Sequence, residues 1–426
     1  MLINKYFQET NRSKTTCYVT ACAALAILVV MTATVQQPLL YDEPIYLNTV
    51  ETLKQYGLSF YFLKNLEIAT GPLYTILHNS LAPLTGLDAP GVRLVNITLL
   101  GLTILTTIGI GYLIKLTLPV LWALCMISIP MTWVLSGMAL TEMPAIFLMT
   151  FGFLLLIWST SPHQTKDGKE THGKNTNVVS AKQIIAAIIG GLAMGVAISG
   201  RQPLLVTLAA VPILAIDSRS RIQVLCFLLS AAIIPIILFA TWGGLVPPTH
   251  QFVGEGLSVP HLILAYCYAG AITLILSPRF FSYNFKITVI IAVFSILINA
   301  IFSWIEFVPM RTLSNQLIPE AVFPIYIEIC SGLLFSLGVL YGASIIKNLI
   351  NNRENFNYLF LGIATLFICF TALKVTHQFS SRYVAQAIPL FALITEPYSK
   401  ANYFKATRVV IGSLLGLAIL TSYYFG

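Results

Sequence analysis

Two adjacent carboxylates in the motif Tyr41-Asp42-Glu43-Pro44 are the first residues along the chain that could do chemistry. They follow an apolar stretch, residues 16–36, by only a few positions. A carboxylate beside such low-dielectric surroundings is a candidate general base or metal ligand. The same spacing also fits a helix start, with Asp42 as the capping residue and Pro44 in the first turn. The two interpretations are compatible, and both stay open at this point.

Three further motifs place a charge at the edge of an apolar stretch. Glu142 suits either an acidic site or a helix N-terminus, where a negative charge is favoured. Arg201 and Arg382 suit bidentate binding of a phosphate, although an arginine in such a turn can also simply extend its charge toward the headgroup layer. The motifs are Thr141-Glu142-Met143-Pro144, Gly200-Arg201-Gln202-Pro203 and the run His377 to Tyr383, which Lys374 precedes.

The elements that must position these residues are membrane helices. Of the 426 residues, 57% are hydrophobic and only 9% are charged, whereas soluble domains carry about a quarter charged residues. Apolar stretches of about 17 to 25 residues, long enough to cross a bilayer, recur from end to end. The net charge of +8 is spread over short loops between these stretches, which is typical of topology signals and not of nucleic-acid binding. The seven cysteines form no CxxC motif and are interpreted as small core residues.

The apolar stretches predict about thirteen transmembrane helices in one domain, residues 1–426. With the N-terminus on the cytoplasmic side, most of the 24 Lys and Arg residues fall inside, as the positive-inside rule requires. The first extracytoplasmic loop, 37–92, carries two amphipathic patterns and is predicted to hold interfacial helices. The loop 159–182 is predicted to be a flexible cytoplasmic connector. The spans are 16–36, 94–114, 117–136, 143–158, 183–200, 202–216, 222–242, 261–277, 287–305, 321–345, 358–375, 383–396 and 409–425.

This topology places Asp42, Glu142, Arg201 and Arg382 on the same, extracytoplasmic side. The chain contains no GxxxxGK[ST], HExxH or GxSxG motif, so nucleotide hydrolysis, zinc proteolysis and hydrolase-type serine chemistry lack support. Acids and arginines facing outward from a large lipid-exposed body suit a substrate with a phosphate-linked polar head and a lipid tail.

In order, spacing and common side, these motifs resemble the GT-C superfamily of polyprenyl-phosphate-sugar-dependent glycosyltransferases, in particular its protein O-mannosyltransferase and lipid A aminoarabinose transferase branch. Glu142 replaces the more usual Asp, and Gly71 stands where Pro is often found. The matching residues are Asp42-Glu43, Thr70-Gly71-Pro72-Leu73-Tyr74, Gly91-Val92-Arg93-Leu94-Val95-Asn96, Thr141-Glu142-Met143-Pro144, Arg201 and Arg382-Tyr383.

The resemblance implies an all-α, GT-C type membrane enzyme that moves a sugar, with inversion, from a polyprenyl-phosphate carrier to an acceptor hydroxyl on a lipid, glycan or protein. It implies that Asp42 deprotonates the acceptor and that Glu43, the second catalytic residue, orients the acceptor, a metal or the sugar. The groups implied to bind the lipid phosphate are Arg201, Arg382, Tyr383 and Lys374, and those implied to orient the acceptor or a metal are Glu142, Tyr41 and His78. A divalent ion, Mg²⁺ or Mn²⁺, is a candidate addition, with Asp42, Glu43 and Glu142 as its candidate ligands.

Two other functions compete with this one. A transporter or flippase of a lipid-linked or anionic substrate also needs polar groups in the membrane, but transporters place charges near the bilayer midplane, and only Glu328 lies deep in a predicted span. A non-catalytic scaffold would tolerate loss of the charged residues. The outer loops contain no N-x-[ST] acceptor, which favours a bacterial inner membrane.

Overall fold

The computed structural model describes residues 9–161, 180–250, 256–281, 283–306 and 318–425. Within these ranges every regular element is a helix, and ten helices are long and apolar enough to cross a membrane, or eleven if one bent pair is counted as a span. The chain is therefore an all-helical polytopic membrane protein, as predicted. The predicted number of thirteen spans is not confirmed.

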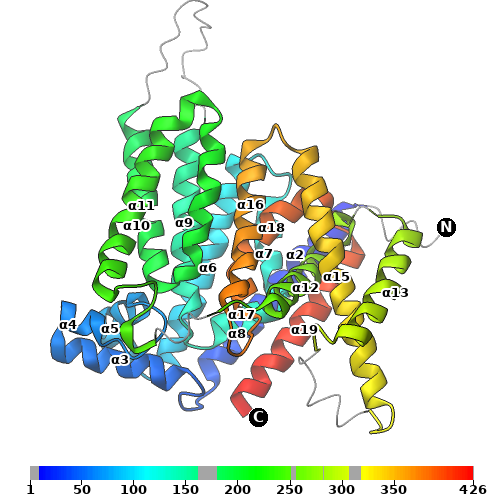
Figure 1. Cartoon of the computed structure of the whole chain (residues 1–426), viewed down its shortest axis with the longest axis horizontal. Helices are drawn as coiled ribbons and strands as arrows, with labels where there is room; N and C mark the ends of the chain where they lie inside the picture. Colours follow the sequence, from blue (N-terminus) through cyan, green and yellow to red (C-terminus); the bar gives the residue numbers. More distant parts are fainter. Residues whose placement is uncertain (1–8, 162–179, 251–255, 282, 307–317, 426) are drawn as a thin grey trace, which may run out of the picture.

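The long helices stand side by side and run between two ends of the molecule (Figure 1). Most of the predicted connector 159–182 lies outside the described residues, and the helices on either side of it end at Thr160 and begin at Ala181. The ten long helices are α2 (Asn11–Thr34), α6 (Gly91–Leu113), α9 (Glu142–Thr160), α10 (Ala181–Gly200), α11 (Arg221–Trp242), α12 (Val259–Leu276), α13 (Phe285–Phe302), α15 (Phe323–Asn351), α16 (Phe356–Phe370) and α19 (Tyr403–Phe425). Helix α16 reaches the length of a span together with the 3₁₀ turn that extends it to Lys374.

Three predicted spans differ from a single long α-helix, and prolines explain each difference because proline interrupts the helical hydrogen-bond ladder. The span 117–136 is a bent pair with an angle of 81°, formed by α7 (Pro119–Leu124) with η1 (Cys125–Ser128) and by α8 (Pro130–Gly137). The span 202–216 is the 3₁₀ helix η2 (Gln202–Ala215), and the span 383–396 is formed by the short helices α17 (Arg382–Ala385) and α18 (Ile388–Thr395). At about 2.0 Å per residue, η2 extends about 28 Å, close to the thickness of a hydrocarbon core.

The first long loop contains the helices α3 (Glu43–Tyr56), α4 (Phe60–Lys64) and α5 (Leu73–Thr85). They lie across one end of the bundle, below α9, α10 and α11 (Figure 1). Helix α3 buries Val50 and Leu53, whereas α5 buries Tyr74 and His78 and leaves Leu84 83% exposed. The remaining short elements are η3 (Ser218–Ser220), η5 (Pro278–Phe280), η6 (Thr371–Lys374) and η7 (Glu396–Tyr398).

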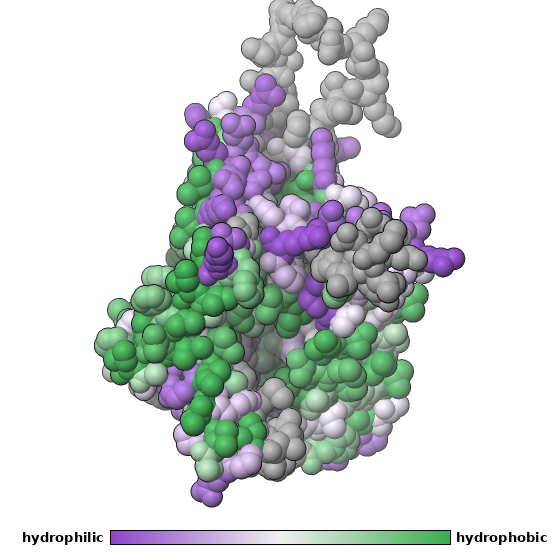
Figure 2. Space-filling model, turned by 90° about the vertical axis from the view of Figure 1, so that its right-hand side faces the viewer, coloured by the Kyte–Doolittle hydropathy of each residue, from purple (hydrophilic) through white to green (hydrophobic). Residues whose placement is uncertain are grey.

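Small residues let the long helices approach closely, as is common in membrane bundles. A Cβ atom added to Gly152 of α9 would lie 2.8 Å from the carbonyl oxygen of Gly190 on α10. The outer surfaces are apolar: Figure 2 shows large hydrophobic areas on the side that faces right in Figure 1, where α13 exposes Phe294 and Ile301. Helix α18, by contrast, is buried along its whole length at the centre of the bundle.

Candidate active site

Four helix ends meet at the end of the bundle that α3 to α5 cover, and each contributes one charged side chain. Asp42 directly precedes α3 and Glu142 is the first residue of α9. Arg201 directly follows α10, which runs antiparallel to α9, and Arg382 is the first residue of α17. We call these four residues the charge cluster. The sequence placed them on one side of the membrane, and the structure brings them into contact.

The charges in the cluster alternate in sign along a chain of ion pairs. The Nη1 atom of Arg382 donates to Oδ2 of Asp42 at 3.0 Å, and its Nε atom lies 3.9 Å from Oε1 of Glu142. The same Glu142 oxygen accepts from Nη2 of Arg201 at 2.5 Å. Asp42 also accepts from the hydroxyl of Tyr46 at 3.3 Å. The Glu142 carboxylate therefore faces two guanidinium groups. The Asp42 carboxylate is held by the guanidinium of Arg382 and the phenol of Tyr46.

The cluster has an open side and a buried side. The Asp42 and Arg382 side chains are 39% and 28% exposed, whereas those of Arg201 and Glu142 are 10% and 0% exposed. Burial, with the Glu142 carboxylate as the next cause, raises the pKa of Tyr46 to about 12. The Tyr46 phenol therefore keeps its proton and can donate to Asp42 at every ordinary pH. A substrate would meet Asp42 and Arg382 first.

Unpartnered polar atoms occur in the charge cluster. Among the described residues, thirteen buried side-chain nitrogen or oxygen atoms lack a hydrogen-bond partner. Two of them belong to the charge cluster, and five belong to Thr70, His78 and Gln386, which lie on or beside α5 and α17. Buried polar atoms are normally paired, so such atoms mark places where a bound polar molecule would supply the partners. The seven atoms are Oε2 of Glu142, Nε of Arg201, Oγ1 of Thr70, both ring nitrogens of His78 and both amide atoms of Gln386.

Gln386 was not singled out from the sequence. It directly follows α17, one helical turn after Arg382, and is only 1% exposed. A residue four positions later on a helix lies on the same face, about 6 Å further along the axis. The only sequence signal was a lone amide within the apolar span 383–396, and such a residue is easily taken for a helix-packing contact.

Glu43 is separated from the cluster although it is adjacent to Asp42. Its carboxylate is fully buried and accepts from Nε and Nη2 of Arg93 at 2.9 and 2.7 Å. It also accepts from the backbone N–H groups of Leu40 and Ala139 at 2.8 and 2.7 Å. With four donors on its two oxygens, Glu43 joins the first loop to α6 and to the segment after α8. This geometry is that of a structural residue.

The capping interpretation of Asp42 is correct in position but not in contact. Helix α3 begins at Glu43 with Pro44 in its first turn, yet the Asp42 side chain makes no capping hydrogen bond. Its oxygens are used by Arg382 and Tyr46 instead.

The other predicted site residues lie around the cluster or outside it. Tyr41 has a positive φ of 51° and is 60% exposed, with its ring against Tyr423. The hydroxyl of Tyr383 lies 3.4 Å from Nε2 of His377. Lys374 donates to the carbonyl of Gly256, at the edge of the described chain.

His78 lies inside the protein, on helix α5. It is fully buried, and its ring centroid lies 4.1 Å from that of Tyr74, which in turn lies 5.6 Å from Tyr46. Burial lowers the pKa of His78 to about 4, so its ring is neutral at ordinary pH.

A close contact fixes Arg201 relative to the first loop. A Cβ atom on Gly71 would lie 1.7 Å from the carbonyl oxygen of Ser199, and one on Gly200 would lie 2.6 Å from the side chain of Leu73. Only glycine allows the two chains to touch in this way. The position where the resemblance would favour proline therefore carries glycine for a steric reason.

The candidate metal ligands Asp42, Glu43 and Glu142 do not form one ligand set. Asp42 and Glu142 are paired with arginines, and Glu43 is turned toward Arg93. Throughout the described ranges, no three His, Cys, Asp or Glu side chains come together. These residues do not fit the candidate Mg²⁺ or Mn²⁺ ion, and no step is assigned to one.

The fold and the site define an all-helical membrane protein with an ion-pair cluster at one end of its bundle. No family model and no curated protein matches the chain. Among solved structures, ArnT from Cupriavidus metallidurans in the apo state is similar with 13% identity over 96% of this chain and 77% of that one, at a TM-score of 0.45. ArnT bound to undecaprenyl phosphate is similar with 12% identity over 93% and 77%, at a TM-score of 0.40.

The oligosaccharyltransferase of Archaeoglobus fulgidus, tethered with an acceptor peptide, is similar with 13% identity over 90% of this chain and 55% of that one, at a TM-score of 0.33. These proteins are GT-C glycosyltransferases, the superfamily that the sequence motifs resemble. Because all three TM-scores are below 0.5, the function proposed next rests on the side chains of the site.

Proposed function

We propose that the chain is an inverting glycosyltransferase that moves a sugar from a polyprenyl-phosphate carrier to an acceptor hydroxyl on the extracytoplasmic side of the membrane. The observation that carries this proposal is the contact of an accessible carboxylate, Asp42, with the partly exposed guanidinium of Arg382. A base and a phosphate-binding cation at one point are what glycosyl transfer from a phosphate requires.

In the proposed reaction Asp42 accepts the proton of the acceptor hydroxyl as its oxygen attacks the anomeric carbon. The bond between that carbon and the phosphate oxygen breaks, and the electron pair leaves with the polyprenyl phosphate. The guanidinium groups of Arg382 and Arg201 stabilise the developing charge, because preorganised cations in a dry site act strongly on it. Tyr46 orients Asp42 through its hydroxyl.

Glu142 has a separate role in this proposal. Its Oε1 atom holds both arginines at 2.5 and 3.9 Å, while its Oε2 atom is buried and unpartnered. The free oxygen is placed to accept a hydrogen bond from a hydroxyl of the sugar. Glu142 would thus fix the distance between the two cations and help to orient the donor.

The test uses the full chain in phospholipid vesicles with polyprenyl-phosphate-linked sugars, and measures the release of free polyprenyl phosphate. Asp42→Asn should lower turnover by about 10²- to 10⁴-fold, the range for loss of a general base, while donor binding remains. Arg382→Gln should weaken donor binding as well. The matched control is Glu51→Gln, because Glu51 is an exposed carboxylate on α3, the helix that Asp42 directly precedes, and is paired with Lys54.

Full turnover by Asp42→Asn would remove Asp42 as the base. The competing transporter makes a different prediction in the same vesicles: a lipid-linked sugar would cross the bilayer without formation of a glycoside. The cluster favours transfer, since its charges lie at one end of the bundle and not near its middle. Glu328, the one acid predicted deep in a span, lies in the second turn of α15.

A further inference from the structure

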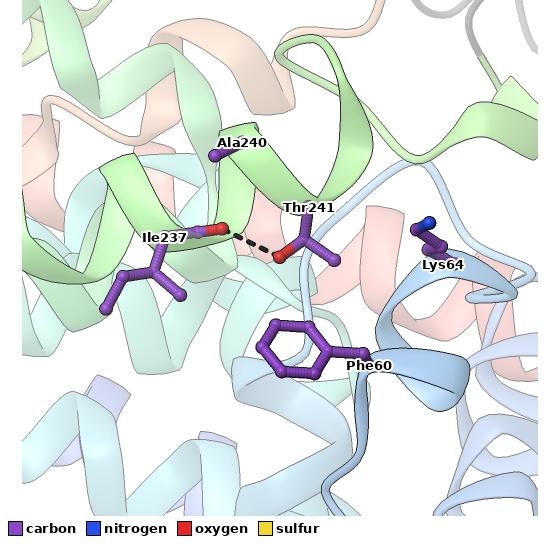
Figure 3. Close-up of a pocket in the computed structure, with 5 residues that line it drawn as sticks. All are labelled: Phe60, Lys64, Ile237, Ala240 and Thr241. Atoms are coloured by element: carbon purple, nitrogen blue, oxygen red, sulfur yellow. Dashed lines mark hydrogen bonds between the residues drawn. The ribbon is translucent and has the colours of Figure 1, made fainter.

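A shallow groove of about 430 Å³ lies between α4 of the first loop and the last turns of α11. Its walls are Ile237, Ala240 and Thr241 from α11, and Phe60 and Lys64 from α4, as Figure 3 shows. The charge cluster contributes no residue to it. The groove is therefore a second feature at the same end of the molecule.

The groove continues an apolar stripe along α11. Large hydrophobic side chains 51% to 63% exposed recur there every three or four residues, and at 1.5 Å per residue the stripe is about 22 Å long. In a membrane helix such a stripe faces lipid chains. It consists of Ile222, Leu225, Leu229, Ile233, Ile236 and Ile237, and it ends where the groove begins.

Helix α4 closes the end of the stripe and is fixed in place. The indole nitrogen of Trp242, at the end of α11, donates to the carbonyl of Leu63 at 2.8 Å. On the outer side α4 exposes Phe60 (68%) and Tyr61 (56%). A lipid chain that follows α11 would therefore meet an apolar floor and not open solvent.

Lys64 is the one charged residue among those described that line the groove. The hydroxyl of Thr241 donates to the carbonyl of Ile237 at 2.8 Å and is already paired (Figure 3). The exposed ammonium of Lys64 makes no ion pair or hydrogen bond with any described residue, including the nearby Glu67. Lys54, on the same loop, is paired with Glu51 at 2.7 Å.

We propose that the groove binds a glycerophospholipid of the bilayer, with its phosphate at Lys64 and an acyl chain along the α11 stripe. An unmatched ammonium at the end of an apolar track complements a phosphate at the end of an acyl chain, and a basic side chain near a membrane surface contributes to binding of anionic lipids. A lipid bound here would tie α4, and with it the first loop, to α11. This site is independent of Asp42 and of the proposed transfer reaction.

The test is native mass spectrometry of the full chain released from micelles and titrated with phosphatidylglycerol. Lys64→Gln should weaken binding of the first lipid about fivefold. Ala240→Trp, which fills the groove from an exposed position, should abolish it. The matched controls are Lys54→Gln, whose charge is already paired, and Ile290→Trp, at an exposed apolar site on α13. Both controls should bind as the wild type does.

Two further ligands and one variant separate the sources of binding. A neutral glycosyl diacylglycerol should bind the wild type as weakly as phosphatidylglycerol binds Lys64→Gln, and inorganic phosphate should not displace the lipid. Equal effects of Lys64→Gln and Lys54→Gln, equal binding of the neutral lipid, or displacement by phosphate would each overturn the proposal. Asp42→Asn should keep the lipid site, so failure of the proposed function would leave this result unchanged.

Discussion

The variant Glu43→Gln tests whether Glu43 stabilises the fold while its neighbour Asp42 acts in the reaction. The Glu43 and Arg93 side chains are both fully buried and joined by two hydrogen bonds of 2.7 to 2.9 Å. Removing one partner of such a pair typically costs about 3 to 5 kcal/mol, because an uncompensated charge stays buried. Arg93 still donates to the carbonyls of Gln37 and Pro38 and lies 4.9 Å from the ring of Tyr424. We therefore expect a loss near the lower limit, about 3 kcal/mol.

The neighbouring variant Asp42→Asn should behave in the opposite way. Its ion pair with Arg382 is 39% and 28% exposed, and exposed pairs contribute about 0 to 1 kcal/mol. Its stability should be close to that of the wild type while its turnover is lost. Glu43→Gln should instead keep the turnover per folded molecule within about tenfold of the wild type, because only the support of the first loop is weakened.

The assay is equilibrium unfolding in mixed micelles of the wild type, Glu43→Gln, Arg93→Met and the double variant. The double variant should lose less than the sum of the single losses, because neither charge is then left alone. Turnover is measured on the same samples at a temperature where all are folded. If Glu43→Gln kept its unfolding free energy while losing turnover, Glu43 would act in the chemistry and the structural interpretation would be refuted.

Three further predictions concern the surroundings of the cluster. Gln386→Leu should leave the free energy of unfolding unchanged or raise it by about 1 to 3 kcal/mol, because an unpartnered buried amide is removed, while sugar transfer falls. A lower free energy of unfolding would show that the amide has a partner within the protein. The pKa of the His78 ring is about 4 in the folded protein against 6.5 in the unfolded chain, so the unfolded chain takes up the proton first as the pH falls. The free energy of unfolding should therefore have its full value above pH 6.5 and fall by about 1.4 kcal/mol per pH unit down to pH 4. The unfolding of His78→Phe should lack this slope. Gly71→Ala should lower the free energy of unfolding by about 1 to 3 kcal/mol and lower sugar transfer, because the added Cβ would collide with the carbonyl of Ser199. The control Gly101→Ala, whose Cβ would enter open space, should change neither quantity in the same unfolding and release assays.

The apolar runs of the sequence predicted most long helices closely. The span 222–242 corresponds to α11, Arg221–Trp242, and the start predicted at 143 corresponds to Glu142. Runs of this kind are set by the thickness of the bilayer, which one sequence can reveal. The bend at Pro130 and the 3₁₀ form of η2 were not predicted, because a run of apolar residues has the same hydropathy in either form.

The different surroundings of Asp42 and Glu43 could not be read from their spacing. Neighbouring residues on a helix point about 100° apart, so only one of them can face the cluster. Which one does so depends on Arg93, fifty positions further along the chain, and on the N–H of Ala139. The sequence showed Arg93 only as part of a motif at the second span. Such long-range partners are decided by packing and not by local pattern.

The alternating charges of the cluster have a consequence for how any anion can be held there. Two carboxylates and two guanidinium groups sum to zero, and each guanidinium already has a carboxylate within 3.0 Å. To bind an arginine of the cluster, a phosphate must therefore displace the carboxylate that is already paired with it. If it takes Arg382, it releases Oδ2 of Asp42. We expect strictly sequential kinetics in which the donor binds first, and acceptor binding before the donor would contradict this expectation. The resting protein would in this way hold its proton acceptor in reserve until there is a sugar to transfer.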